Sequence, residues 1–109
     1  MATIDLTELT RNEVRSLIGY ERGERARDYF ELGKLDRGVE SIRVTAPANL
    51  RTLTPSFVQG FLGNSILSLG LEAFRNHYLF DGFSALQIQS IETGIDRVLM
   101  KRSFETTAA

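Results

Sequence analysis

One segment constrains the fold more than any other, because it turns from a hydroxyl-rich loop into an amphipathic helix. Thr54 is placed to cap this helix, and Pro55 suits the first helical position, where its missing N–H would have no partner anyway. Gly60 and Gly63 lower the intrinsic helicity, so packing against a core must stabilise the helix. The apolar stripe that provides this packing consists of Phe57, Val58, Phe61, Leu62, Ile66 and Leu69.

The rest of the chain alternates between strand and helix patterns. Strands are predicted over residues 3–6, over 42–46, where apolar and polar residues alternate, and over the compact apolar run 77–81. Helices are predicted after Gly23, from Thr54 to Gly70, and from the Ser84 and Gln87 capping box to about residues 101–102. The pattern indicates an α/β (α+β) fold with a small sheet of about 3–4 strands and three main helices packed on it.

The length of 109 residues indicates a single domain covering residues 1–109. Its core is expected over residues 22–102. Residues 1–21 are read as an N-terminal strand and a polar segment with no assigned state, and residues 103–109 as a frayed tail. Residues 47–54 are expected to form a connection, and 36–38 a turn.

The composition excludes several classes of function. Thirteen basic and 14 acidic residues give a net charge of -1, which argues against nucleic acid as the main ligand. The chain has no cysteine, which fits a cytoplasmic location, and no apolar run approaches the roughly 18 residues of a membrane span. No cofactor and no metal are expected, because His77 is the single histidine and the carboxylates show no ligand spacing.

The start of the helix at Thr54 is the strongest candidate site. Free N–H groups and a partial positive charge at a helix N-terminus suit a phosphate or a partner's carboxylate. Ser56 and Thr54 are therefore candidate phospho-acceptors. Helix capping alone also explains both hydroxyls and is the favoured interpretation, above all for Thr54 as the N-cap, while the sequence leaves the regulatory interpretation open.

Two further sets of residues are candidates for binding. Around the helix start, a protein partner is expected to contact Leu53, Pro55, Phe57, Gln59, Asn64 and, after a turn, Phe83. Arg22 and Arg25 form a weaker candidate for anion binding, because interleaved acidic residues make a solvated helix face the simpler explanation.

The order of elements resembles a known family. The pattern runs from Arg22-Gly23 through the strand at 42–46 and Leu53-Thr54-Pro55-Ser56-Phe57 to the strand, turn and helix at 78–102. It is similar to the STAS-like domains of unknown function, which are related to anti-sigma-factor antagonists. In such antagonists an ATP-using anti-sigma factor phosphorylates a serine at a helix N-terminus, and Ser56 corresponds to it by position. The Asp-Ser-Ser-Gly-type sequence of the antagonists is absent here.

The leading hypothesis is a non-enzymatic, regulatory protein-interaction module. The resemblance implies an ATPase or kinase of the anti-sigma type as its partner. The alternative is a self-assembling structural or accessory protein, a homo-oligomer with no phospho-switch, for which Leu67 outside the main apolar stripe is one indication. No catalytic residue is proposed, since no pairing of a nucleophile with a base can be named.

Overall fold

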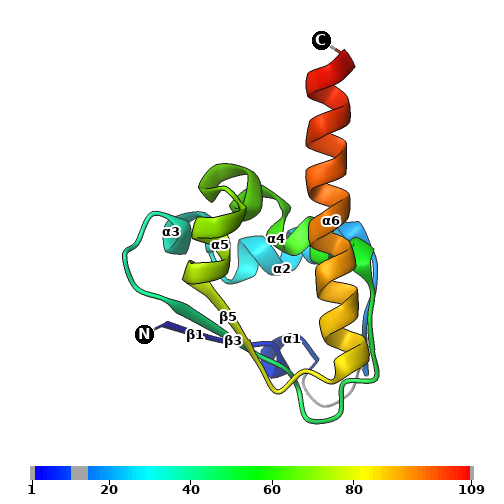
Figure 1. Ribbon diagram of the computed structural model, residues 1–109. Helices are drawn as coiled ribbons and strands as arrows, with labels where there is room; N and C mark the ends of the chain where they lie inside the picture. Colours follow the sequence, from blue (N-terminus) through cyan, green and yellow to red (C-terminus); the bar gives the residue numbers. More distant parts are fainter. Residues whose placement is uncertain (1, 11–14, 109) are drawn as a thin grey trace.

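The computed structural model has a mixed α/β fold, as the sequence predicts, and describes residues 2–10 and 15–108, with side chains as far as Lys101. Helices and strands alternate along the chain (Figure 1). In order they are β1 (Ala2–Asp5), α1 (Thr7–Thr10), β2 (Ser16–Leu17), α2 (Tyr20–Tyr29), α3 (Leu32–Asp36), β3 (Ile42–Thr45), β4 (Thr52–Leu53), α4 (Pro55–Leu69), α5 (Leu71–His77), β5 (Tyr78–Asp81) and α6 (Ala85–Ala108).

The main sheet has three parallel strands in the order β1-β3-β5. Successive residues of a strand point to opposite faces, so each row across the sheet belongs to one face. The row of Ile4, Val44 and Phe80 faces the helices, whereas Arg43 and Leu79 lie exposed on the other face. Most helices therefore gather on one side of this sheet (Figure 1).

A second, two-stranded sheet lies outside the sequence expectation. Strands β2 and β4 pair in parallel, with Leu17 opposite Leu53. Residues 47–54 were expected to form a plain connection, and the polar segment before Tyr20 had no assigned state. Residues 11–14 of that segment lie outside the described part. The pairing brings the start of α2 beside the start of α4, although the two are far apart in sequence.

Helices α2 and α4 cross in direct backbone contact. A Cβ atom at Gly60 would overlap the carbonyl oxygen of Tyr20, and one at Gly23 would overlap that of Phe57. The sequence reading placed Gly23 in a loop before the helix, which is wrong, because α2 begins at Tyr20 and contains Gly23. Glycine is needed at both positions because any side chain would push the helices apart.

Helix α6 packs on α4 and then continues past it. The capping box that begins α6 is confirmed, since the Ser84 hydroxyl accepts from the Gln87 N–H at 3.2 Å and the Gln87 side chain accepts from the Ser84 N–H at 2.9 Å. Its end near residues 101–102 is wrong, because the helix extends to Ala108. Figure 1 shows these last turns protruding beyond the body of the molecule. Within the described residues, every helix is too short or too polar to cross a membrane.

Replacing Gly60 with alanine tests the backbone contact. We expect Gly60→Ala to lower the free energy of unfolding by about 1–3 kcal/mol, because the added methyl group meets backbone that cannot move aside. The matched control is Gly33→Ala in α3, where nothing lies within 4 Å of the added Cβ. Urea denaturation of both variants measures the difference, and equal stabilities would contradict the close crossing.

Candidate functional site

The N-terminus of α4 is held by Thr54, as the sequence predicts. The Thr54 hydroxyl accepts a hydrogen bond from the Phe57 N–H at 3.3 Å, and Pro55 occupies the first turn. The same oxygen accepts from the Gly19 N–H at 3.2 Å, which ties the start of α2 to the start of α4. With both acceptor positions used, the Thr54 hydroxyl can donate its proton to the Ser56 hydroxyl, 3.2 Å away. Ser56 itself is half-buried beside this cap.

The structure separates the predicted contact residues into buried and accessible ones. Leu53 and Phe57 are 6% and 1% exposed, so their side chains belong to the core and do not form the partner surface expected of them. Pro55 and Gln59 are half-buried, and Asn64 is exposed. The apolar stripe of α4 is oriented by the core, and this orientation decides which residues reach solvent.

The remaining predicted binding residues, Phe83, Arg22 and Arg25, do not belong to α4. Phe83 is half-buried, and its ring meets that of Phe80 at an edge, with 6.1 Å between centroids. Arg22 and Arg25 are both exposed on α2. Neither arginine lines the groove described next.

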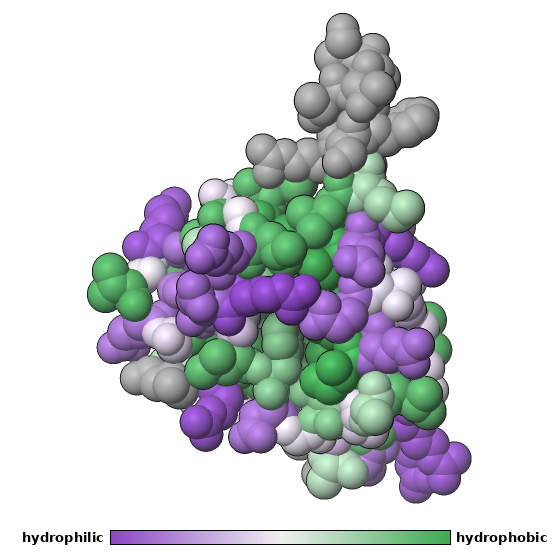
Figure 2. Space-filling view, in the orientation of Figure 1, coloured by the Kyte–Doolittle hydropathy of each residue, from purple (hydrophilic) through white to green (hydrophobic). Residues whose placement is uncertain are grey.

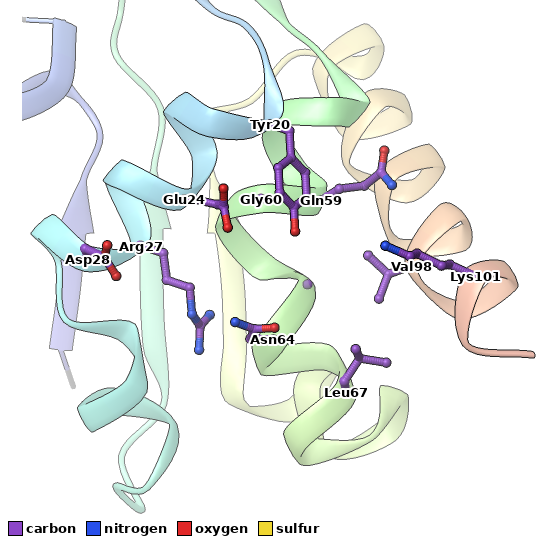
Figure 3. Close-up of a pocket in the computed structure, with 11 residues that line it drawn as sticks. Tyr20, Glu24, Arg27, Asp28, Gln59, Gly60, Asn64, Leu67, Val98 and Lys101 are labelled. Carbon is purple, nitrogen blue, oxygen red and sulfur yellow. The ribbon is translucent and has the colours of Figure 1, made fainter. Parts of the chain in front are cut away.

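A groove of about 530 Å³ lies between α2, α4 and α6. Figure 3 shows α4 along its floor, with side chains of α2 on one side and of α6 on the other. Gly60 and Gly63 leave the floor without side chains between Gln59 and Asn64. The residues that line it are Tyr20, Glu24, Arg27, Asp28, Gln59, Gly60, Gly63, Asn64, Leu67, Val98 and Lys101.

One side of α4 connects the two candidate regions. Ser56, Gln59, Gly63 and Leu67 follow one another at intervals of three or four residues, so they share one side of the helix. We call this strip, from Ser56 to Leu67, the α4 face. The helix start that the sequence singled out therefore lies on the same side of α4 as the groove, in whose floor Gly63 is buried.

A buried polar cluster fixes the α2 side of the groove. The Arg27 guanidinium donates to Asp36 at 2.9 Å, to the Ser65 hydroxyl at 2.7 Å and to the Phe61 carbonyl at 3.2 Å. Asp36 also accepts from the Ser65 hydroxyl at 2.7 Å and from the Tyr78 phenol. These five hydrogen bonds satisfy charges that would be costly to bury alone, and together they join α2, α3, α4 and β5.

Sequence reasoning missed this cluster and most of the groove. The sequence pattern places Asp36 in a turn and Tyr78 in an apolar strand, and neither pattern pairs them with Arg27. No spacing in the sequence relates these positions, because they come from separate elements. One signal did exist for the groove, since Leu67 lies outside the main apolar stripe of α4 and is 42% exposed.

The charges around the groove are unevenly divided. Glu24 and Asp28 are exposed on the α2 side, and the charge of Arg27 is already matched by Asp36. Lys101 faces them from α6 (Figure 3). The α2 side is therefore acidic and the α6 side basic, an arrangement suited to a ligand with charges of both signs.

His77 and the acidic side chains are the candidate metal ligands among the described residues. Within that part of the chain, no three histidine, cysteine or acidic side chains are grouped so that they could hold a metal ion. His77 Nε2 lies 2.9 Å from the Leu35 carbonyl oxygen, and its ring meets that of Tyr78 edge-on. His77 therefore lies where the end of α5 meets α3.

Comparisons of the chain with protein-family models, with curated proteins and with solved structures found no match. The similarity to STAS-like domains therefore rests on the sequence pattern alone and stays a prediction.

Replacement of Thr54 distinguishes a cap from a neighbouring hydroxyl. We expect Thr54→Ala to lower the free energy of unfolding by about 1–2 kcal/mol, because two N–H groups lose their acceptor. Ser56→Ala is the matched control and should cost less, since Ser56 contacts the cap without forming it. Thermal and urea denaturation measure both. A larger loss for Ser56→Ala would overturn the assignment.

Tyr78 makes stability depend on pH in the alkaline range. Burial, and next the hydrogen bond to Asp36, raise the pKa of the Tyr78 phenol well above its ordinary value. The folded state thus holds a proton that the unfolded chain releases above about pH 10. The contribution of Tyr78 to the free energy of unfolding is therefore fully present below that pH. Above it, this contribution falls by up to about 1.4 kcal/mol per pH unit.

Substitution by phenylalanine tests this dependence. Tyr78→Phe should lower the free energy of unfolding at neutral pH by about 1–3 kcal/mol, because Asp36 loses a donor. As the pH rises above about 10, its free energy of unfolding should also decrease less than that of the wild type. Tyr29→Phe, at an exposed tyrosine, is the control and should follow the wild type. Parallel pH profiles for Tyr78→Phe and the wild type would contradict the proposed role.

Proposed function

We propose that this chain is a non-enzymatic regulatory module that binds a protein partner over the α4 face, from Ser56 to Leu67. The observation that carries the proposal is the alignment of these residues along one side of α4. The half-buried Ser56 and Gln59 and the exposed Leu67 share this side, Asn64 is exposed beside them, and Gly63 is buried in the groove floor. Polar groups beside a small apolar contact are typical of a regulated, reversible interface.

Ser56 is the residue through which this interface would be regulated. It lies in the first turn of α4, where the helix dipole favours an added negative charge. A phosphate there would bring close to two negative charges to the surface that a partner covers, while the Thr54 cap keeps the helix start in place. The proposal gives Thr54 a structural role and leaves Ser56 as the phospho-acceptor.

The partner class comes from the similarity to anti-sigma-factor antagonists. It suggests an ATPase or kinase of the anti-sigma type, which would both bind the α4 face and modify Ser56. The absence of cysteine is compatible with a cytoplasmic partner. Gln59 and Asn64, which line the groove beyond Ser56, are suited to form the polar rim of this contact.

The test begins with affinity purification of the tagged chain and mass spectrometry of the partner and of Ser56. The recovered ATPase or kinase is then expressed and titrated against three variants by calorimetry. We expect Ser56→Asp to weaken binding about tenfold or more, because the charge lies within the contact, and Ser56→Ala to bind like the wild type.

The control for added charge is Ser68→Asp, at an exposed serine near the other end of α4 that does not line the groove. It should bind like the wild type. Equal binding by Ser56→Asp and Ser56→Ala would reject the switch, and the absence of any partner that binds the purified chain would reject the module.

A further inference from the structure

The backbone of α6 continues beyond the part of the helix that packs on the body of the molecule. Ile91, Ile95 and Val98 are buried against the core, but Met100 is 67% exposed and the backbone stays helical to Ala108. Figure 1 shows these final turns protruding from the body. A short helical extension is marginal in water, since most helical stability in proteins comes from tertiary packing. Packing against a surface outside this copy would therefore stabilise the extension.

Apolar side chains lie at the base of the protruding turns. We call this group the apolar foot, and it consists of Leu67, Leu69, Leu71 and Leu99. Leu67 is 42% exposed, and Leu69, Leu71 and Leu99 are only partly buried. Figure 2 shows hydrophobic side chains gathered between α6 and the junction of α4 with α5. Leu67 also lines the groove, so the apolar foot is continuous with the groove. Grouped exposed apolar residues with polar neighbours are typical of protein contacts.

Charges on α2 and α6 identify the occupant. The α2 side of the groove presents Glu24 and Asp28. On α6, Arg97 and Lys101 are exposed one helical turn apart. Asp96 lies instead toward α5, where it interacts with the charge of Arg75. An α6 end from another copy would therefore bring basic side chains to an acidic groove wall.

We propose that two copies of this chain form a two-fold dimer in which the end of each α6 lies over the α2–α4–α6 groove of the other. In such an isologous contact both copies use the same surface, and the assembly is closed. The dimer packs the protruding turns, covers Leu67 and Met100, and pairs the basic edge of α6 with Glu24 and Asp28. This contact goes beyond the proposed function, because its occupant is a second copy of the chain. It overlaps the partner surface at Leu67 and in the groove, and it leaves Ser56 to the partner protein.

The experiment is sedimentation velocity on the full chain over a wide range of concentration. The wild type should shift from monomer to dimer as the concentration rises. Leu67→Glu should raise the dimer dissociation constant about tenfold or more, because it places a charge in the apolar centre of the contact. Leu79→Glu is the matched control, since Leu79 is 41% exposed on the outer face of the sheet, and it should dimerise like the wild type.

A charge exchange tests the orientation. Arg97→Glu should weaken the dimer, and adding Glu24→Lys to it should restore part of the affinity, because the two changes exchange the signs across the contact. Circular dichroism confirms that each variant is folded. A chain that is monomeric at every concentration overturns the proposal, as does a dimer that Leu67→Glu leaves intact or that Leu79→Glu weakens equally. None of these outcomes depends on the Ser56 titrations with the partner protein.

Discussion

Helices α2 and α4 touch through their backbones, with no side chain between them where Gly23 meets Gly60. This contact sets the distance between the two helices, and everything on their outer surfaces follows from it. The Thr54 hydroxyl reinforces it by holding the N–H of Gly19 together with that of Phe57. The groove exists because α2 meets α4 this closely and glycines keep its floor free of side chains.

The polar cluster under the groove stabilises one arrangement of the elements. Arg27, Asp36, Ser65 and Tyr78 come from α2, α3, α4 and β5, and each satisfies a polar group of another. A buried ion pair gives little net stability compared with an apolar core, but removing one member leaves a charge without its partner. The cluster also leaves Glu24 and Asp28 as the acidic groups of the groove wall, since it neutralises Arg27.

The two proposed contacts lie on one helix and overlap at Leu67. Ser56 lies in the first turn of α4, where free N–H groups favour added negative charge, and Leu67 lies in the last turn, beside the apolar foot of α6. Because α4 has one face in the core, its other face is a rigid platform, and side chains presented from it keep fixed positions. A protein partner and a second copy would therefore compete for Leu67 and the groove, whereas Ser56 belongs to the partner contact alone.

The sequence by itself determined the α/β class, the main strands, the start of α4 at the Thr54 cap and the start of α6 at the Ser84 and Gln87 capping box. These features depend on neighbouring residues, whose spacing expresses helix capping and strand alternation directly. Only the tertiary structure decided the β2–β4 pairing, the role of Gly23 and the buried ion pair of Arg27 with Asp36. It also buried Leu53 and Phe57, which the sequence had placed at a surface. Each of these depends on residues far apart in the chain, and their proximity is set by how the elements pack.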